Sequence, residues 1–592
     1  MTERNRTFLL VPAAGAGEGV GHMARCLRLA AMLDGHVTFL TARMNPEARA
    51  WLAKEILRFP SRSRPASVAK PAAGAQWDLV LVDARRTSLV ELDALMTHGK
   101  VVCLDEGGEA RAYASFLVDA FPRVPGASPA NLDSPAYLGL PARTVKRVRL
   151  PAKRVLVSFG GEDRAKLSGR LLDALLREGL FSPAELTVVE GPLFTAREWP
   201  RGVTVLKGVS QLSAILPDYD LVFTHYGVTA FDAMAAGIPA ILLNPGRYHE
   251  VLAASAGMPR IGVMSPDIRA LRRLLQDRGA LQKKVEGFNA SLPRDRAHAL
   301  ARLLARLAAR GSPLCPVCSA AGNRVIARFP DRTYRRCRTC GTTYLESFAA
   351  EEKAYDRRYF FADYRAQYGR TYLQDFDSIK AASRPRVRVI RDLLGEHPDG
   401  VLVDIGCAYG PFLDAAKESG MPGYGVDVSP EAVTYVRKKL GIPAVRGAFE
   451  DLGKKALPHR ISAVTMWYVI EHFQQTDLAI RKAAALLPPG GVFAFSTPNG
   501  RGISARRHLH DFLFHSPADH FTIFSPRGLG KLLAGYGLEL RRIRVTGHHP
   551  ERFPGVAGRL ADKSAGAYAV LRAASRLLGW GDTFEAYAVK GD

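Results

Sequence analysis

Short apolar runs alternate with helical periods along most of the chain. In the first 300 residues, nine runs rich in β-branched residues are separated by segments whose apolar positions recur every three or four residues. This alternation is typical of strands and helices that build parallel sheets with both faces covered. Nine strands are too many for one small sheet, and a basic connector at 143–153 separates two groups of them. We therefore expect two doubly wound domains that face each other across a cleft.

A second region of alternation begins near residue 399. Seven strand patterns run from VLVDIG to FEAYAVKG, without a clear helical crossover between the last two. The pattern predicts a doubly wound sheet closed by an antiparallel strand, so the fold class is α/β throughout. The expected domains are a Rossmann-like domain at 1–146, a second at 147–311, a small cysteine-bearing module at 312–346, an aromatic and helical approach at 347–398, and a last α/β domain at 399–592.

Composition and charge narrow the class of protein. Hydrophobic residues make up 47% of the 592 and charged residues 23%, which is typical of a globular protein. No run approaches ~18 apolar residues, so we expect neither a membrane span nor a signal peptide, and a cytoplasmic location. Lysine and arginine total 82 against 57 acids. This excess favours polyanionic partners, although basic residues spread over solvated faces would explain it equally well.

Four of the seven cysteines form two Cys-x2-Cys pairs that are eighteen residues apart. In a chain with no predicted export signal, this spacing indicates a tetrahedral thiolate site for zinc rather than disulfides. Four thiolates leave no open coordination position, so we expect the zinc to be structural. The predicted ligands are Cys315, Cys318, Cys337 and Cys340.

A glycine-rich turn follows the first predicted strand. Gly19 and Gly21 allow a tight turn and a close approach of the backbone to a ligand, and the next helix begins at His22. The positive end of a helix opposes protonation of an imidazole, which leaves His22 neutral and able to accept a proton. A plain helix-capping role is the alternative for this histidine.

The string GVGHMARCLRLA at 19–30 resembles the opening of the UDP-sugar hydrolases of pseudaminic acid biosynthesis, in the GT-B nucleotide-sugar superfamily. The resemblance continues through DLVLVDAR, VLVSFGGEDRAKL and HYGVTAFDAMAAGIPAILL. It implies a GT-B pair of domains, a UDP-sugar or related ligand, and His22 in the catalytic centre. The chain departs from the family pattern at Tyr226 and at Tyr248-His249, and Asp232 replaces a glutamate. Hydrolysis, glycosyl transfer and binding alone therefore stay open. The implied nucleotide-sugar residues are Gly19, Gly21, Arg25, Gly160, Gly161, Gly227, Thr229 and Asp232.

A second turn, DIGCAYG at 404–410, follows a strand and opens a helix. About twenty residues later, YGVDVS places Asp427 at the end of the next strand. Such a turn lets the backbone approach a nucleoside cofactor, while the acid accepts hydrogen bonds from ribose hydroxyls. On spacing alone, nicotinamide dinucleotide and S-adenosylmethionine fit equally well.

The elements after this turn, including MWYVIEHF, ALLPPGGVFAFSTPN and DHFTIFS, resemble those of class I S-adenosylmethionine-dependent methyltransferases. Together with the cysteine module, they are similar to methyltransferases of sugar and surface-polysaccharide pathways over about residues 313–540. The resemblance implies S-adenosylmethionine as the cofactor. It also implies the cofactor residues Asp404, Gly406, Ala408, Gly410, Asp427, Phe449 and Trp467.

Methyl transfer to a hydroxyl group needs an in-line nucleophile and a base, and histidine suits the second role at neutral pH. His520 follows the fifth strand, where acceptor pockets are built, and is the predicted base. Glu471 and His472 are expected to shape the site. A supporting histidine without contact to the acceptor is the alternative for His472.

Taken together, these patterns favour a bifunctional enzyme of glycan or nucleotide-sugar metabolism. A methyltransferase for a sugar or glycoconjugate would be fused to a UDP-sugar hydrolase or glycosyltransferase. The alternatives are a methyltransferase with a non-catalytic targeting domain and a zinc-ribbon RNA methyltransferase; we do not expect nucleic acid as a partner, because no RNA-stacking module is recognisable. The basic amphipathic segment 555–580 either contacts an anionic membrane or packs on its own domain.

Overall fold

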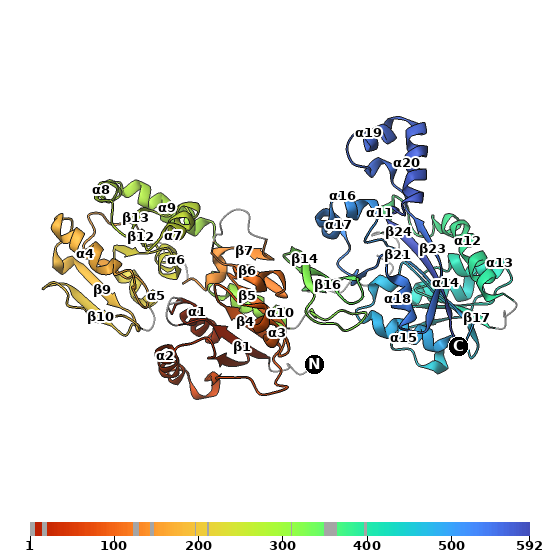
Figure 1. The fold of residues 1–592 in the computed structure, drawn as a ribbon, viewed down its shortest axis with the longest axis horizontal. Helices are drawn as coiled ribbons and strands as arrows, with labels where there is room; N and C mark the ends of the chain where they lie inside the picture. The colour runs from red at the N-terminus through yellow and green to blue at the C-terminus, as the bar shows by residue number, and fades with distance from the viewer. Residues whose placement is uncertain are drawn as a thin grey trace. The chain divides into compact units, whose positions relative to one another are not determined.

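The chain divides into two compact units, and each is described by itself. Unit 1 comprises residues 1–311 and 328–330, and unit 2 comprises 312–327 and 331–592 (Figure 1). Gly19 and residues 349–363 and 396–398 of the predicted approach segment lie outside the described residues. The computed structural model describes residues 6–14, 20–121, 129–141, 147–195, 197–209, 212–308, 311–348, 364–395 and 400–592.

Unit 1 contains a seven-stranded sheet in the order β3-β2-β1-β4-β5-β6-β7, in which neighbouring strands are parallel. Residues 8–11 of the interior strand β1 are buried without exception, as expected for a parallel strand covered on both faces. The strands are β1 (Thr7–Pro12), β2 (His36–Leu40), β3 (Ala66–Val68), β4 (Leu79–Asp83), β5 (Val101–Leu104), β6 (Phe116–Asp119) and β7 (Leu132–Asp133).

A second parallel sheet of unit 1 has six strands in the order β10-β9-β8-β11-β12-β13. Across the two sheets, β3, β6, β7 and β13 add to the nine predicted strands. The strands of the second sheet are β8 (Val155–Val157), β9 (Leu186–Glu190), β10 (Thr204–Lys207), β11 (Leu221–Thr224), β12 (Ala240–Asn244) and β13 (Arg260–Val263).

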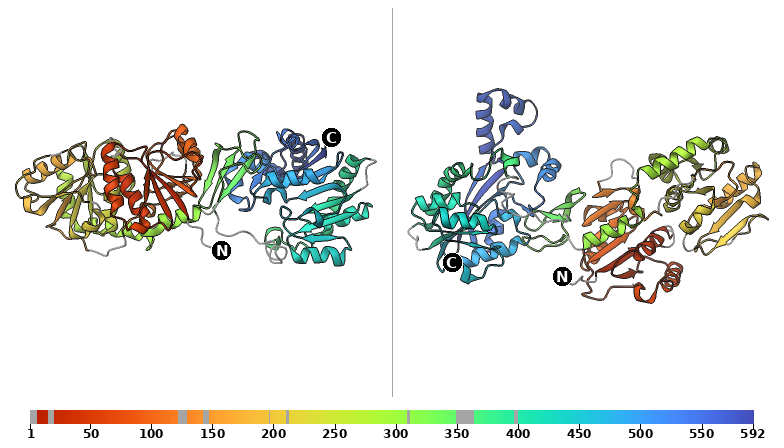
Figure 2. Two further views of the ribbon diagram at one scale, coloured as in Figure 1. Left: turned by 90° about the horizontal axis from the view of Figure 1, so that it is seen from below. Right: turned by 180° about the vertical axis from the view of Figure 1, so that it is seen from behind.

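Helices connect and cover both sheets of unit 1, as Figure 2 shows. The two sheets meet where α1 begins: a Cβ on Gly161 would lie 2.3 Å from Cγ2 of Val20, so only glycine fits there. The helices are α1 (Gly21–Ala30), α2 (Pro46–Leu57), α3 (Leu89–Met96), α4 (Leu167–Arg177), α5 (Leu212–Ile215), α6 (Val228–Ala235), α7 (Arg247–Ser255), α8 (Ile268–Gln276), α9 (Arg278–Ala290) and α10 (Ala299–Ala308).

Unit 2 is built on a seven-stranded sheet in the order β19-β18-β17-β20-β21-β24-β23. Strand β24 runs antiparallel to both of its neighbours, which confirms the predicted closing strand. The seven predicted patterns correspond to β17 (Val401–Ile405), β18 (Gly423–Asp427), β19 (Ala444–Arg446), β20 (Ile461–Trp467), β21 (Val492–Pro498), β23 (Leu538–Thr546) and β24 (Thr583–Lys590).

Alternate residues of this sheet face two different cores. Leu402 and Ala463 pack against α12, α13 and α14, whereas Val403 and Val464 pack against α15 and α18. The helices of unit 2 are α11 (Tyr364–Tyr368), α12 (Phe376–Leu394), α13 (Pro411–Glu418), α14 (Pro430–Lys439), α15 (Thr476–Leu486), α16 (Ile503–Arg507), α17 (Leu509–His515), α18 (Leu529–Ala534), α19 (Val556–Lys563) and α20 (Ala565–Leu577).

The cysteine module forms a small sheet in the order β14-β15-β16-β22. Its last strand, β22, comes from the α/β region and pairs antiparallel with β16. The sequence pattern did not predict this pairing, which ties the module to a segment about 180 residues away. The strands are β14 (Arg324–Phe329), β15 (Arg332–Arg336), β16 (Thr343–Ser347) and β22 (Thr522–Ile523). Among the described residues, no helix is long and apolar enough to cross a membrane.

Candidate functional site

The turn between β17 and α13 needs residues that tolerate a left-handed backbone. Gly406 has a φ of +67°, and a Cβ at this position would lie 2.4 Å from Cγ2 of Val469. Ala408 adopts a φ of +48°, a region that costs a residue with a side chain about 1 kcal/mol or more. Gly410, with a φ of +79°, precedes the first residue of α13. The structure thus places the three predicted turn residues in one tight loop at the carboxyl edge of the sheet.

Two buried acids hold this loop. The Asp427 carboxylate accepts hydrogen bonds from the backbone N–H groups of Ala408 and Ser429, each at 2.8 Å. Asp404 accepts one from the Thr465 hydroxyl at 2.6 Å. Burial raises the pKa of both acids, and that of Asp404 to about 7. Both carboxyl groups would therefore be more readily ionised beside a cationic ligand.

The two predicted aromatic cofactor residues lie on opposite faces of the sheet. Phe449 is buried in the core on the α15 side, with Nζ of Lys482 4.9 Å from its ring centroid. Trp467, at the end of β20, packs on the α12 side against Phe412, and the Arg386 guanidinium carbon lies 4.4 Å from its ring centroid.

The predicted catalytic residues of unit 2 come together. Glu471 and His472 lie in the 3₁₀ turn Ile470–His472 after β20, and His520 lies just before β22. The rings of His472 and His520 meet edge to face, with centroids 4.7 Å apart. Their ligand-type atoms and a Glu471 carboxylate oxygen all lie within 4.8 Å of one another. The structure adds Asp519, whose Oδ2 is 3.3 Å from Nδ1 of His472.

Burial and neighbouring charges shift the pKa values of Glu471 and His472 in this cluster. Burial raises the pKa of Glu471 to about 7, against the opposing field of His472. Burial alone would lower the pKa of His472, but Asp519 and Glu471 raise it above its ordinary value. The cluster therefore contains groups that can accept and release a proton close to pH 7.

The cysteine module braces this cluster through backbone hydrogen bonds. Leu345 N–H of β16 donates to the Phe521 carbonyl at 2.9 Å, and Phe521 N–H donates to the Glu471 carbonyl at 2.7 Å. Asp477 N–H, at the start of α15, donates to the carbonyl of Pro316 at 2.8 Å. The module is thus hydrogen-bonded to Phe521, which follows His520, and to Asp477, a few residues after Glu471 and His472.

The four cysteine sulfurs form one cluster. Their Sγ atoms all lie within 4.8 Å of one another. Sγ of Cys315 is 3.6 Å from that of Cys340, and Sγ of Cys318 is 3.5 Å from that of Cys337. A tetrahedron with Zn–S bonds of about 2.3 Å has sulfurs about 3.8 Å apart, so the predicted ligands fit a zinc ion.

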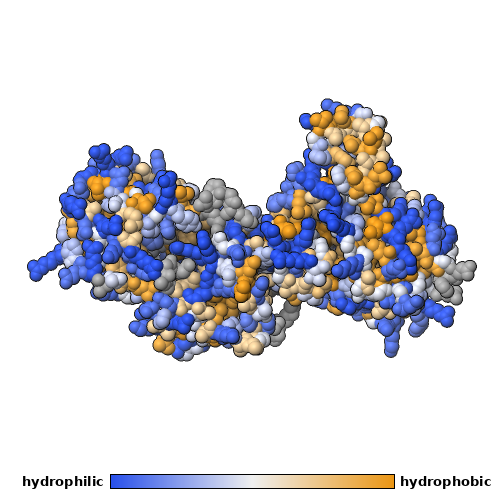
Figure 3. All heavy atoms as spheres, viewed as in Figure 1, coloured by the Kyte–Doolittle hydropathy of each residue, from blue (hydrophilic) through white to orange (hydrophobic). Residues whose placement is uncertain are grey.

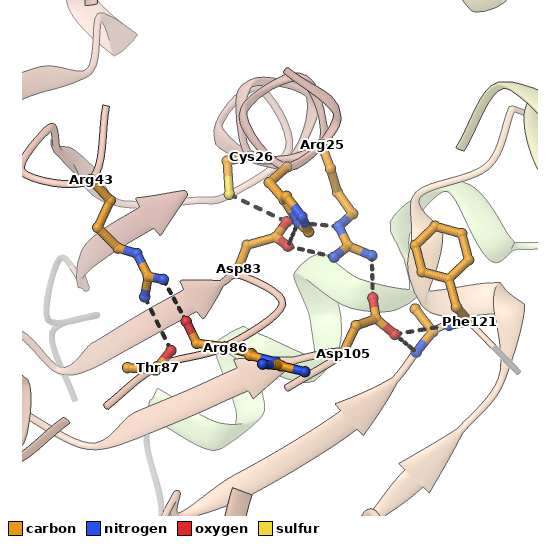
Figure 4. Close-up of polar contacts among 10 residues, drawn as sticks. Arg25, Cys26, Arg43, Asp83, Arg86, Thr87, Asp105 and Phe121 are labelled. Atoms are coloured by element: carbon orange, nitrogen blue, oxygen red, sulfur yellow. Dashed lines mark hydrogen bonds and ion pairs between the residues drawn. The ribbon is translucent and has the colours of Figure 1, made fainter. Parts of the chain in front are cut away.

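A second polar cluster lies at the carboxyl edge of the first sheet of unit 1 (Figure 4). His22 Nδ1 is 2.6 Å from Oδ1 of Asp83, which ends β4. Arg25 donates to both Asp83 oxygens and, at 2.8 Å, to Asp105. Asp105 also accepts from the N–H groups of Ala120 and Phe121 at 2.8 and 2.9 Å. Burial alone would raise the pKa of Asp83, but Arg25 and His22 hold it well below the usual value.

An ion pair links this cluster to the second sheet of unit 1. Arg28 Nη1 of α1 lies 3.0 Å from both carboxylate oxygens of Asp232 on α6. Burial raises the pKa of Asp232 against the opposing field of Arg28. Asp232, which the resemblance implies as a nucleotide-sugar residue, therefore already has a cationic partner.

The predicted glycines of the second sheet lie near this ion pair. Gly227 immediately precedes α6, and Thr229 is in the first turn of that helix. A Cβ on Gly160 would lie 3.3 Å from Nε2 of the buried His225, and one on Gly227 would lie 3.3 Å from Cε1 of the same ring. The loops after β8 and β11 thus pack around one histidine, while Gly21 at the start of α1 has no other atom near its would-be Cβ.

Sequence reasoning missed three acids that organise these sites. Asp83 and Asp105 follow adjacent parallel strands, where ligand-binding residues gather, and this position was the signal available for them. Asp519 directly precedes the predicted base His520, but only the tertiary fold brings it to His472.

Comparison with known protein families finds a match within unit 2. A family model described as a methyltransferase domain matches residues 378–543. A ubiquinone biosynthesis O-methyltransferase of Nitrosospira multiformis is 23% identical over 159 residues, covering 25% of this chain and 66% of that protein. One from Bordetella avium is 26% identical over 165 residues, covering 26% and 63%. The chain thus spans about two thirds of these relatives.

Two further matches cover fewer residues or have a lower sequence identity. An uncharacterised protein of Methanocaldococcus jannaschii is 28% identical over 101 residues, covering 15% of this chain and 20% of that protein. The crystal structure of a SAM dependent methyltransferase from Archaeoglobus fulgidus is 15% identical with a TM-score of 0.28, covering 39% of this chain and 100% of that one. The family match, the strand order and the loop at 404–410 agree: residues 378–543 form a class I S-adenosylmethionine-dependent methyltransferase domain.

Proposed function

We propose that unit 2 transfers a methyl group to a hydroxyl group of a sugar or glycoconjugate. The observation that carries this proposal is the convergence of Glu471, His472 and His520 at the carboxyl edge of the methyltransferase sheet. A hydroxyl acceptor must lose its proton as the new bond forms, and a histidine pair with an acidic partner suits that task. The curated relatives are named O-methyltransferases, which supports oxygen as the acceptor atom.

The cofactor, when bound, supplies an activated methyl group on its sulfonium. Transfer of this methyl group to the acceptor oxygen would release S-adenosylhomocysteine and the hydroxyl proton. His520 takes the hydroxyl proton, as the sequence predicts, while Asp519 fixes the ring of His472 beside it. Glu471, with a pKa of about 7, stabilises the imidazolium that results.

The residues of the loop at 404–410 fit S-adenosylmethionine. Asp427 would hold the ribose hydroxyls. The N–H groups of Ala408 and Ser429 donate to its two oxygens and so fix this carboxylate at the loop. Asp404 would face the positively charged methionyl part, since burial raises the pKa of this acid to about 7 against the opposing effects of Thr465 and Arg386, and a nearby cationic ligand would favour its ionised form. In the cysteine module, we propose a structural zinc held by Cys315, Cys318, Cys337 and Cys340.

For unit 1 we propose binding of a UDP-sugar or related nucleotide-sugar. His22, oriented by Asp83, would act as the base for hydrolysis or glycosyl transfer. The ion pair between Arg28 and Asp232 favours a second candidate, a non-catalytic targeting role, because a ribose would have to compete with Arg28 for that carboxylate.

Isothermal titration with S-adenosylmethionine and, separately, with UDP tests both halves of the proposal. Gly406→Arg should abolish S-adenosylmethionine binding and leave UDP binding unchanged, because a side chain there collides with Val469. His22→Ala should leave both affinities within a few-fold but stop turnover of a UDP-sugar. Loss of product from His22→Ala separates catalysis from targeting, and failure of the unmodified protein to bind UDP would contradict the proposal for unit 1.

A further inference from the structure

Two helices inserted between β23 and β24 leave most of their large apolar side chains exposed. In Figure 1, α19 and α20 project from the sheet of unit 2, and apolar surface gathers on them in Figure 3. Buried positions in the two helices are confined to Gly558, Ala561 and Ser575. We call residues 553–580 the helical hairpin. Its exposed large hydrophobics are Val556, Leu560, Tyr568, Val570, Leu577 and Leu578.

These side chains have the spacing of an amphipathic surface. Val570 and Leu577 are seven residues apart on one face of α20, with exposed fractions of 68% and 90%. Val556 and Leu560 are four residues apart on α19. Both helices of the hairpin thus expose large apolar side chains of the kind that a soluble domain normally covers.

Charge on the helical hairpin favours one class of partner. Its basic residues are Arg559, Lys563, Arg572 and Arg576, against a single acid, Asp562. Apolar side chains among cationic ones are characteristic of helices that lie in the interface of an anionic bilayer. Two copies of the same hairpin would instead bring like charges together.

The base of the helical hairpin is anchored next to the methyl-transfer centre. The Asp582 carboxylate accepts hydrogen bonds from Arg552 at 2.7 Å and from the Ser504 hydroxyl at 2.6 Å. Asn499 N–H donates to the Asp582 carbonyl at 2.8 Å. Asn499 directly follows β21, whose Ser496 carbonyl accepts a hydrogen bond at 3.0 Å from the N–H of Tyr468, three residues before Glu471. The helices therefore rise from the sheet edge that carries the candidate catalytic residues.

We propose that the helical hairpin docks unit 2 on an anionic lipid surface, with Val556, Leu560, Val570 and Leu577 in the acyl boundary and the basic side chains among the headgroups. The methyl acceptor is then an amphiphilic glycoconjugate held in that membrane. Docking stands on the hairpin alone, whereas the acceptor class rests on the proposed methyl transfer.

Sedimentation of the full-length protein with vesicles tests the docking. Vesicles of equal phosphatidylglycerol and phosphatidylcholine should bind the protein, and pure phosphatidylcholine should bind it at least tenfold more weakly. Because the headgroup attraction is electrostatic, binding should weaken as salt rises from 0.05 to about 0.5 M. Equal binding to both vesicle types, or none to either, overturns the proposal.

Paired substitutions locate the contact. The double variant Val570→Asp with Leu577→Asp should bind phosphatidylglycerol vesicles at least tenfold more weakly, because two apolar contacts are lost. Val90→Asp, at an 82% exposed site on α3 of unit 1, is the matched control and should bind normally. Unchanged binding by the double variant overturns the proposal, and so does a vesicle-independent dimer that this variant dissociates.

Titration with S-adenosylhomocysteine separates this proposal from the proposed function. The double variant should bind it as the unmodified protein does, which shows that unit 2 is folded. If the unmodified protein binds vesicles but not S-adenosylhomocysteine, the methyl-transfer proposal fails while the docking proposal holds. If it methylates soluble acceptors and the double variant does so equally, while only methylation of a vesicle-held glycolipid falls, the acceptor class is supported as well.

Discussion

Asp83 in unit 1, the last residue of β4, and Glu471 in unit 2, in the turn after β20, are both buried carboxyl groups, and their pKa values move in opposite directions. Arg25 and His22 surround Asp83 and lower its pKa. Glu471 has His472 as its main charged neighbour, and burial raises its pKa to about 7. Burial acts in the same sense on both, so the permanently charged Arg25, which donates to both oxygens of Asp83, decides the outcome.

The difference separates a structural ion-pair network from a group that can exchange protons. Asp83 stays ionised at any physiological pH, so it can orient His22 and Arg25 but cannot accept a proton. Glu471, with a pKa of about 7, changes protonation near neutrality, where the proposed methyl transfer to a hydroxyl group has to release a proton. The two units thus use buried acids for different purposes.

Asp83→Asn is expected to have the largest effect on stability. The change leaves the buried Arg25 guanidinium without its main counter-charge, which costs about 3–5 kcal/mol. Because the Asp83 pKa is lowered in the folded protein, the stabilisation exists above the unfolded pKa and is lost in acid. Hydrogen exchange of the β1 and β4 amides at pH 7, followed by mass spectrometry, measures the loss in unit 1.

A surface ion pair supplies the control for that variant. Asp173→Asn removes an exposed partner of Arg197 and should cost less than about 1 kcal/mol. If exchange in β1 and β4 were the same in Asp83→Asn as in Asp173→Asn, Asp83 would not be the carboxylate that holds Arg25 in place.

Glu471→Gln should stabilise unit 2, whereas Asp83→Asn should destabilise unit 1. The folded pKa of about 7 lies above the ordinary value, so Glu471 destabilises the fold increasingly as pH rises from about 4.5 to 7, and by a constant amount above that. Glutamine removes this penalty, which is up to about 3 kcal/mol at pH 8 and absent near pH 4. Exchange of the β17 and β20 amides at both pH values measures it.

The same variant should lose methyl transfer while it gains stability. Glu539→Gln, at an exposed site on β23, is the matched control and should change neither quantity. A Glu471→Gln protein that is less stable than the unmodified protein at pH 8 would mean that Glu471 is held ionised, and the contrast with Asp83 would disappear.

Local patterns were sufficient for the large sheet of unit 2. Apolar runs separated by turns predicted all seven strands of its large sheet, and the missing crossover predicted the antiparallel β24. The short strands β3 and β7 of unit 1 were not predicted, because two or three residues carry too little periodicity. The pairing of β16 with β22 was also not predicted, since no local signal encodes contact between segments so far apart.

The candidate sites were predictable where a motif carries its own chemistry. The spacing of Cys315 to Cys340 anticipated the sulfur cluster, and the loop at 404–410 anticipated the buried Asp427. The partners of those residues were not predictable, because hydrogen bonds such as that between Asp519 and His472 depend on how the chain returns. The resemblance grouped Phe449 with Trp467, but a sequence does not say on which face of a sheet a ring lies.

Asp519→Asn sharpens the comparison within unit 2, with a smaller effect. Asp519 raises the pKa of His472 against the effect of burial, so the amide should let that pKa fall. The raised pKa stabilises the fold below the ordinary histidine pKa, and this contribution should shrink in the variant. Histidine Cε1 resonances, followed by NMR from pH 5 to 9, report the His472 titration without any acceptor.

Asp511→Asn on α17, where the side chain is exposed, should leave that titration unchanged. If methyl transfer depends on this pair, its rise with pH should shift to lower pH together with the resonance. A lower rate at every pH with an unmoved resonance would instead assign Asp519 a packing role and leave Glu471 as the main source of the charge that His472 senses.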